Sequence, residues 1–442
     1  MSSIDTTQDQ LALTITGEEI AAAQVPWRRW LAVFYCFDAT TSLLFTSAVW
    51  VIYLASRGYS PLAIGLFETI FHIAKFVAEV PTGIFADLVG RRKSLAICCI
   101  IGAIENLLFL APAPPVMVLS FSLAGISWAF RGGAHEAILW MIAGHAEPAN
   151  QSARYSKLIS RMFMLALVGE IIGTASGGFL GHLLTILPFI CQSAAFALGI
   201  VPLLLLPEQR GTREQRARPL VHLCTGLRAV QQAPALLGLL LISALTDSCW
   251  QTIYFYYQLY LHGLGFSLPV IGLLVAASTV SSFLFTAAAP FMMRHLPQRW
   301  LVPLFVSVEI VGLFCMSLPQ SIISLFGYLV LFQASVAVLA PAISTYINEH
   351  SPEAQRATIF SLQTGLFSAA MIVLFPLFGL GITQVAYRTV YLWTLEGLII
   401  GSIAIGVLVW TVCRRTTASG KRLARELDED VSYKKEAGDL SS

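Results

Sequence analysis

Twelve long apolar runs constrain the fold of this chain more than any other feature of its sequence. A helix needs about 20 apolar residues to cross the hydrocarbon core of a membrane, and each run has 20–27 residues. Only 12% of the 442 residues are charged, whereas soluble domains carry about 25%. The sequence therefore predicts an all-α integral membrane protein with twelve transmembrane helices. The runs are 30–54, 61–86, 94–114, 116–141, 158–183, 185–206, 236–261, 268–294, 299–318, 321–347, 357–381 and 388–412.

A polar, basic interruption at 207–235 divides these helices into two sets of six. Residues 52–66 align without a gap to 259–273, which places glycine at 58 and 265 and again at 65 and 272. Two parallel six-helix repeats are typical of one large class of transporters. We therefore predict five regions: a tail at 1–26, a six-helix bundle at 27–206, a linker at 207–235, a second six-helix bundle at 236–412 and a tail at 413–442.

Lysine and arginine predict the orientation in the membrane. Arg57 and Arg388 fall in loops on one side, and Lys75 and Arg131 lie within helices. These four leave 23 of the 27 basic residues on the other side, which the positive-inside rule makes cytoplasmic. We therefore expect both termini in the cytoplasm and a location in the plasma membrane, which is the inner membrane of a Gram-negative cell. Bases spread along a membrane face do not indicate nucleic-acid binding.

The sequence lacks the motifs of several enzyme classes. It has no phosphate-binding glycine loop, no HExxH and no serine nucleophile elbow. None of the eight cysteines falls in an outside loop, so neither a disulfide framework nor a metal site is indicated. We expect no enzymatic activity and no cofactor, and we expect an ion gradient to supply the energy for any transport.

One charged turn separates the second and third apolar runs. Residues 83–93 read Gly-Ile-Phe-Ala-Asp-Leu-Val-Gly-Arg-Arg-Lys. The spacing Gly-x-x-x-Asp-x-x-Gly-Arg-Arg resembles the signature loop of the major facilitator superfamily. The resemblance covers the chain from about 28 to 415 and implies two six-helix bundles that move a small solute across the bilayer by alternating access. We expect such a transporter to function as a monomer.

The resemblance implies a gate at this loop. Glycine permits a tight turn, and Asp87 is expected to accept hydrogen bonds from the start of the eleventh helix, near 356–358. Arg91 is expected to pair with Glu136 and so hold the cytoplasmic side shut. Alternatively, the bases at 91–93 only anchor the topology. The predicted gating residues are Gly83, Asp87, Gly90, Arg91, Arg92 and Glu136.

The fifth apolar run is rich in glycine. Residues 169–178 read Gly-Glu-Ile-Ile-Gly-Thr-Ala-Ser-Gly-Gly. They resemble the antiporter motif Gly-x-x-x-Gly-Pro-x-x-Gly-Gly, with Thr174 where that motif has proline. The alternative is ordinary packing of small residues between helices. Glu170, which lies well inside the membrane span, favours the antiporter interpretation.

Ionisable groups inside membrane helices are functional candidates because their burial is costly. Asp38 and Asp247 lie in helices one and seven, which are equivalent in the two repeats. Each begins a polar and aromatic face at helical spacing, and an acid beside aromatic rings suits an amphipathic or cationic solute. Alternatively, the tyrosines belong to an interfacial aromatic belt. The predicted substrate-binding residues are Asp38, Thr41, Phe45, Arg131, Asp247, Trp250, Tyr254 and Tyr257.

Helix two carries Glu68, His72, Lys75 and Glu79 on one face. This stripe either carries protons, with His72 titrating nearest neutrality, or forms a self-neutralising seam against another helix. Arg131 is expected to be neutralised by an anionic substrate group or by Glu170. The acids at 105 and 309 lie on helices that the resemblance makes outer scaffold, so we expect them to have little role in transport. The predicted proton-coupling residues are Asp38, Glu68, His72, Glu170 and Asp247.

These observations favour a secondary active transporter that exports a small amphipathic organic solute by proton antiport. One alternative is a proton symporter or facilitator that imports a nutrient, and a remote one is a membrane sensor or scaffold that transports nothing. Flux against a gradient in vesicles discriminates among them. The sequence names neither the solute nor the direction, and Na⁺ in place of H⁺ stays open.

Overall fold

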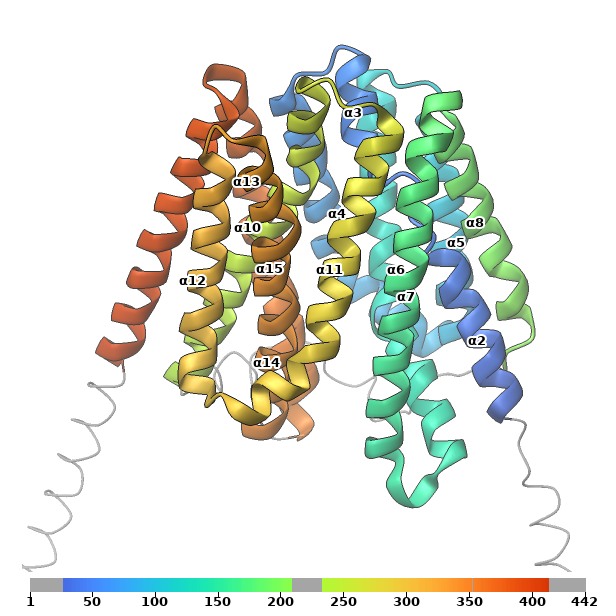
Figure 1. The fold of residues 1–442 in the computed structure, drawn as a ribbon. Helices are drawn as coiled ribbons and strands as arrows, with labels where there is room; N and C mark the ends of the chain where they lie inside the picture. The colour runs from blue at the N-terminus through green and yellow to red at the C-terminus, as the bar shows by residue number, and fades with distance from the viewer. Residues whose placement is uncertain (1–26, 209–232, 352, 413–442) are drawn as a thin grey trace, which may run out of the picture.

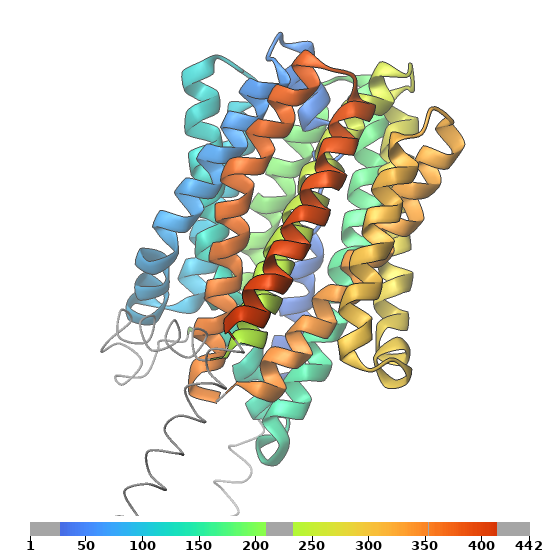
Figure 2. The same ribbon diagram turned by 90° about the vertical axis from the view of Figure 1, so that its left-hand side faces the viewer.

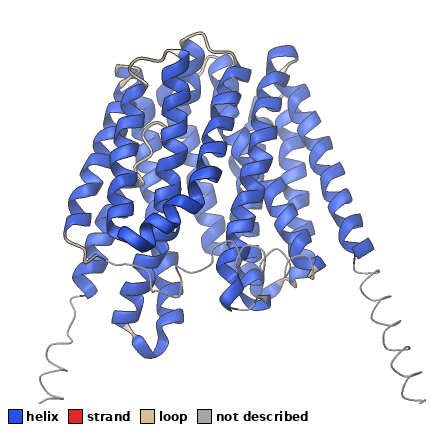
Figure 3. Cartoon of the chain, turned by 180° about the vertical axis from the view of Figure 1, so that it is seen from behind, coloured by secondary structure: helices blue, strands red, loops and turns tan. Residues whose placement is uncertain are grey.

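The computed structural model describes residues 27–208, 233–351 and 353–412. These residues form helices joined by short loops and contain no strand (Figure 3). The predicted tails at 1–26 and 413–442 and most of the predicted linker lie outside the described residues. Ten of the described helices are long and apolar enough to cross a membrane, so the predicted all-α membrane fold is confirmed.

The helices form two sets that lie side by side (Figure 1). The first set is α2 (Trp27–Thr41), α3 (Trp50–Ser56), α4 (Pro61–Val89), α5 (Arg91–Leu108), α6 (Pro114–Ala146), the short η1 (Pro148–Asn150), α7 (Gln151–Leu183) and α8 (Leu187–Leu204). The second is α10 (Pro234–Gly263), α11 (Leu268–His295), α12 (Gln298–Ser317), α13 (Ser321–Phe326), the π-helical η2 (Gly327–Phe332), α14 (Gln333–His350), α15 (Glu353–Gln384) and a last helix, Tyr387–Val412.

Two of the twelve predicted spans are not among those ten helices. One is the α2–α3 segment. The other is α5, which has 18 residues and includes Arg91, Arg92, Lys93 and Glu105. The count of twelve transmembrane helices therefore stays a prediction. The last helix lies on the outer face of the second set (Figure 2). Only 6% of an 18-residue apolar stretch of this helix is buried, as expected for a surface that faces lipid.

The two ends of the molecule are distinguished by the helix ends and turns that lie there. The start of α2 and the end of the last helix lie at the same end, the lower one in Figure 1. The chain crosses once through α2 and α3 and returns through α4, so the turn at Gly90 also lies at this end, which we call the Gly90 end. We call the opposite end, with the turns at Gly58 and Gly265, the Gly58 end.

The aligned segments 52–66 and 259–273 fold alike. Gly58 and Gly265 both have positive φ, 90° and 89°, a conformation that glycine adopts without a steric penalty. The following serines, Ser60 and Ser267, each precede a helix in an extended conformation. The internal similarity in the sequence therefore corresponds to one turn geometry that occurs in both halves.

The first predicted helix is not continuous. We expected one helix over 30–54, but α2 ends at Thr41, α3 begins at Trp50, and 42–49 form turns. The glycine face of α7 packs on this segment: a Cβ atom added at Gly173 or Gly177 would overlap the backbone of Leu44 or Phe45. The expectation was wrong because it rested on the overall apolarity of the run, which does not distinguish a helix from a turn packed against another helix. Hydroxyl residues lie around the break, at Thr40, Thr41, Ser42, Thr46 and Ser47.

The corner between α4 and α5 is also sharper than predicted. Gly90, with φ 135°, is the single residue between the two helices. Gly83, expected to help make this turn, lies inside α4, where a Cβ atom would have nothing within 4 Å. Its assignment to the turn was wrong because α4 continues to Val89.

Candidate functional site

Two neighbouring cavities lie between the halves. The inner cavity has a volume of about 310 Å³ and the outer cavity about 650 Å³, and Lys75 and Trp128 line both. The outer cavity is bordered by the ends of α4 and α5, by α6 and by α15, so it lies toward the Gly90 end. The inner cavity lies deeper and is mostly aromatic. Its rings are Trp50, Phe71, Phe109, Phe121, Trp128, Phe189, Phe196, Phe255 and Phe367.

Contacts between the halves close the opposite end. Ser47 shares a hydrogen bond of 2.9 Å with the Tyr254 hydroxyl, and Gln258 Nε2 donates to the Ser47 carbonyl oxygen at 2.8 Å. The Tyr256 hydroxyl donates to the Pro61 carbonyl oxygen at 2.7 Å. The conformation is thus closed at the Gly58 end and hollow toward the Gly90 end. With the predicted orientation, this is an inward-facing state.

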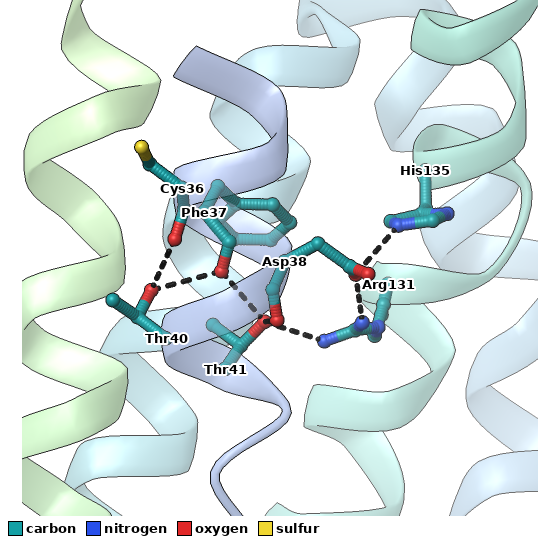
Figure 4. A network of polar contacts seen from close by, with 7 residues as sticks. All are labelled: Cys36, Phe37, Asp38, Thr40, Thr41, Arg131 and His135. Carbon is teal, nitrogen blue, oxygen red and sulfur yellow. Dashed lines mark hydrogen bonds and ion pairs between the residues drawn. The ribbon is translucent and has the colours of Figure 1, made fainter. Parts of the chain in front are cut away.

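A polar cluster lies at the wall of the outer cavity (Figure 4). Arg131 Nη2 donates to Asp38 Oδ1 at 2.7 Å, and Arg131 Nη1 donates to Thr41 Oγ1 at 2.9 Å. His135 Nε2 lies 3.0 Å from the same Asp38 oxygen. Asp38 and Thr41 come from α2, whereas Arg131 and His135 come from α6. Packing of these two helices thus places a buried carboxylate against one permanent cation and one titratable base.

This cluster changes two expectations from the sequence. Arg131 is neutralised by Asp38, whereas we expected an anionic substrate group or Glu170. The expectation was wrong because α2 and α6 are distant in sequence and only packing pairs them. His135 was missing from the predicted site. A partial signal was present, since His135 follows Arg131 by four residues, which is the spacing of neighbours on a regular helix. The backbone between them is not regular, because Gly132 has non-helical dihedral angles (φ −35°, ψ −115°).

Glu170 joins the halves. The Tyr254 hydroxyl donates to Glu170 Oε1 at 3.1 Å, and the Thr279 hydroxyl donates to the same oxygen at 3.4 Å. Glu170 belongs to α7, whereas its partners belong to α10 and α11. These bonds therefore lie in an interface that has to rearrange if the halves rock against each other.

The predicted face on helix seven splits into separate environments. Ser243 donates to Asp247 Oδ2 at 2.7 Å, and Trp250 donates to Gln333 at 3.0 Å. Tyr257 is fully buried and stacks on Tyr328, with ring centroids 4.1 Å apart. Tyr257 thus packs in the core of the second half, and the interpretation of the whole face as a cavity wall was wrong. Helical spacing fixes a common face, but neighbouring helices decide how much of it they cover.

The stripe on α4 lies along the cavities. Glu68, His72 and Lys75 line the inner cavity, and Lys75 and Glu79 line the outer one. His72 Nε2 lies 3.6 Å from Glu68 Oε1. The charged stripe therefore extends along one continuous wall from the deep cavity toward the Gly90 end.

Four of the six predicted gating residues line the outer cavity, namely Gly83, Asp87, Arg91 and Glu136. Arg91 Nη2 lies 3.6 Å from Asp87 Oδ1, and Glu136 lines the same cavity. Arg92 Nε lies 3.3 Å from Glu208 Oε2 just after α8, a partner that the sequence analysis did not identify. The expected docking of Asp87 on helix eleven and the pair of Arg91 with Glu136 concern the closed form of this end. They stay predictions.

We expect Asp87→Asn to favour the form that is open at the Gly90 end. The substitution removes the charge that a helix N-terminus would stabilise by about 0.3–1 kcal/mol when this end closes. Labelling of a cysteine introduced at Ser361, which lines the outer cavity, should become several-fold faster than in the same cysteine variant with Asp87 intact. Equal labelling and equal transport in the two proteins would contradict the gate.

Comparisons with known proteins agree with this architecture. Residues 29–374 match the family model described as the MFS_1 like family. The uncharacterized MFS-type transporter YxaM of Bacillus subtilis (strain 168) is 24% identical over 362 residues, which cover 79% of this chain and 88% of YxaM.

Solved structures share the fold at low sequence identity. A mutant form of the nucleoside transporter NupG matches with a TM-score of 0.71 and 16% identity, covering 86% of this chain and 98% of that one. A D-xylose-proton symporter matches with a TM-score of 0.67 and 15% identity, covering 88% and 97%. These two likenesses concern the fold alone.

Proposed function

Because the chain belongs to the MFS_1 like family of the major facilitator superfamily, we propose that it exports a small amphipathic organic solute in exchange for protons. The observation that carries the proposal is the contact of Asp38 with both Arg131 and His135 at the cavity wall. The protein is a multi-pass membrane transporter. The exchange with protons, the direction of transport and the class of solute are what we propose.

The cluster can couple a proton to a rearrangement of helices. An ionised Asp38 holds the Arg131 guanidinium and so joins α2 to α6. A proton on Asp38 removes the carboxylate charge and weakens this contact between α2 and α6, while Arg131 keeps its hydrogen bond to Thr41. His135 contacts the same carboxylate oxygen, and an imidazole ring can both bind and release a proton. His135 can therefore pass a proton between the outer cavity and Asp38.

The inner cavity suits an amphipathic solute. Its aromatic rings provide large apolar faces that favour organic molecules, and Glu68, His72 and Lys75 provide polar groups at one side. A solute in the inner cavity lies on the route between the closed Gly58 end and the outer cavity. Alternating access would then open the Gly58 end by separating α7 from α11 and α4 from α15.

The remaining parts of the proposal follow from the family. A secondary transporter needs only the bilayer, the solute and an ion gradient, so we expect no cofactor and no enzymatic activity. We expect it to work as a monomer in the plasma membrane, with the Gly90 end in the cytoplasm.

Proteoliposomes test the exchange directly. With the purified protein, ethidium (a cationic aromatic solute) and chloramphenicol (a neutral one) should each be tried under an imposed pH gradient. We expect uphill flux of at least one of them and a matching proton movement reported by a pH-sensitive dye. Flux that only equilibrates would indicate a facilitator, flux that follows a sodium gradient would replace H⁺ by Na⁺, and flux in the direction of the protons would indicate a symporter.

A further inference from the structure

The inner cavity extends away from the interface between the halves into the first half. Its far wall is formed by Glu105 and Asn106 of α5, Phe121 of α6, and Phe189 and Gln192 of α8. From the sequence we expected Glu105 to lie on an outer scaffold helix and to have little role in transport. The structure shows this side chain at a cavity wall instead.

The far wall contains polar groups whose hydrogen-bonding capacity is unused. Gln192 is 2% exposed, and neither its amide nitrogen nor its amide oxygen has a hydrogen-bond partner among the described residues. Buried polar atoms are nearly always paired in native proteins, because an unpaired one costs about 1–3 kcal/mol. The amide of Gln192 is therefore available to form hydrogen bonds with a molecule in the cavity.

The acidic side chain at this wall also lacks a basic partner. No ion pair among the described residues includes Glu105. Its carboxylate accepts a hydrogen bond from the neutral side-chain amide of Asn106, and Ser120 donates to the backbone oxygen of Glu105 at 2.9 Å. An ionised carboxylate with only neutral donors is unfavourable away from water. A cation in the cavity would supply the missing charge.

Charged groups elsewhere in the cavity do not supply that cation. Lys75 and His72 lie on α4, where Glu68 and Glu79 share the same helix face. The groups that α6, α8, α10 and α15 contribute to the inner cavity are aromatic, small or uncharged. The acid at 105 is therefore a separate group that lines the same cavity from α5, whereas the stripe lies on α4.

We propose that Glu105 and Gln192 form a subsite for a protonated amine of the transported solute. The proposal rests on the transport function and adds the substrate class. An ammonium group offers three hydrogens and no acceptor, so it suits the Glu105 carboxylate and the Gln192 carbonyl oxygen but does not pair with the Gln192 amide nitrogen. Phenylalanine rings beside them, such as Phe121 and Phe189, add cation–π attraction. The apolar body of the solute then lies among the aromatic rings of the inner cavity.

Three probes with one indole body test the charge preference. Radiolabelled tryptamine is the amine, tryptophol is the neutral alcohol, and indole-3-acetate is the anion. Equilibrium binding to the full-length protein in nanodiscs should show saturable tryptamine binding. Tryptophol and indole-3-acetate should compete at least tenfold more weakly than unlabelled tryptamine.

Two variants and a matched control test the residues. Glu105→Gln keeps the shape and removes the charge, and Gln192→Leu removes both amide groups. Each should weaken tryptamine binding at least tenfold. Glu309→Gln is the control, because Glu309 occupies the equivalent place in the second half, is fully buried and lines neither cavity. It should bind tryptamine like the wild type. If Glu105→Gln is not recovered as a folded protein, Gln192→Leu carries the same test.

The results distinguish failure of the amine subsite from failure of the proposed antiport function. No saturable tryptamine binding by the wild type, equal binding by Glu105→Gln, or equal competition by indole-3-acetate would overturn the subsite. Tryptamine flux driven by a pH gradient, together with unchanged binding in Glu105→Gln, would leave antiport in place and refute the subsite. Binding that depends on Glu105 without any gradient-driven flux would leave the subsite in place and refute antiport.

Discussion

Asp38→Asn should abolish transport driven by a pH gradient while the protein still inserts and folds. Asparagine keeps the shape of the side chain but cannot take up or release a proton. It also leaves Arg131, which now contacts Asp38 at 2.7 Å, without its counter-charge. Removing one partner of a buried ion pair destabilises a protein by about 3–5 kcal/mol, so a lower melting temperature should accompany the functional loss.

Two transport assays separate coupling from binding in this variant. Uphill uptake under a pH gradient should fall to the level of empty liposomes. Counterflow of labelled against unlabelled solute, which needs no net proton movement, should persist. His135→Gln should reduce uphill uptake less, because Asp38 and Arg131 still pair. Glu309→Gln provides the control for neutralising a buried carboxylate away from the cavities. Uphill transport by Asp38→Asn at the wild-type rate would exclude Asp38 as the coupling group.

Gly177→Ala should destabilise the protein, although alanine is a better helix former than glycine. The added methyl group would overlap the carbonyl oxygen of Phe45, which belongs to the backbone of the turn segment between α2 and α3. A backbone atom cannot move aside by changing a rotamer, so α7 and this segment would have to separate. Overpacking of this kind costs about 1–3 kcal/mol, and the loss of α7 packing should also impair transport.

The control variant for this prediction should change the stability in the opposite direction. Gly397 lies in the last helix, where a Cβ atom would have nothing within 4 Å. Gly397→Ala should therefore raise the stability by about 0.5–1 kcal/mol, the usual gain from replacing a helical glycine. Thermal unfolding of the two variants in the same detergent gives the comparison. If Gly177→Ala melts at or above the wild-type temperature, the close approach of α7 to residues 42–49 is absent in solution.

The position of α7 explains why a glycine-rich face is useful there. On one side its glycines meet the broken first helix, and on another Gly178 lies against Gly272 of α11, where an added Cβ atom would be 2.9 Å from the Gly272 Cα atom. Close backbone approach lets one helix contact both the turn segment 42–49 and the other half. The resemblance of 169–178 to an antiporter motif is consistent with this position, but the packing alone does not establish exchange.

Some features could be predicted from the sequence because they depend on local chemistry. Apolar length determined the helices that cross the membrane, since any residue in hydrocarbon has to be apolar and has to satisfy its backbone hydrogen bonds internally. The turn glycines at 58 and 265 revealed the internal repeat, because a positive φ strongly favours glycine. The stripe on α4 followed from helical periodicity, which fixes which side chains share a face.

Other features depended on which helix packs against which. The partner of Arg131, the burial of Tyr257 and the exposure of Glu105 to a cavity are set by neighbours that lie tens of residues away in the sequence. The Ser and Thr residues around the break at 42–49 are only a weak local signal, because such residues also occur within regular helices. By itself, the sequence determined a helical membrane protein with repeated halves and the acids, bases and glycines available for function. Only the tertiary structure decided which of these meet, because contact between helices depends on packing that periodicity does not encode.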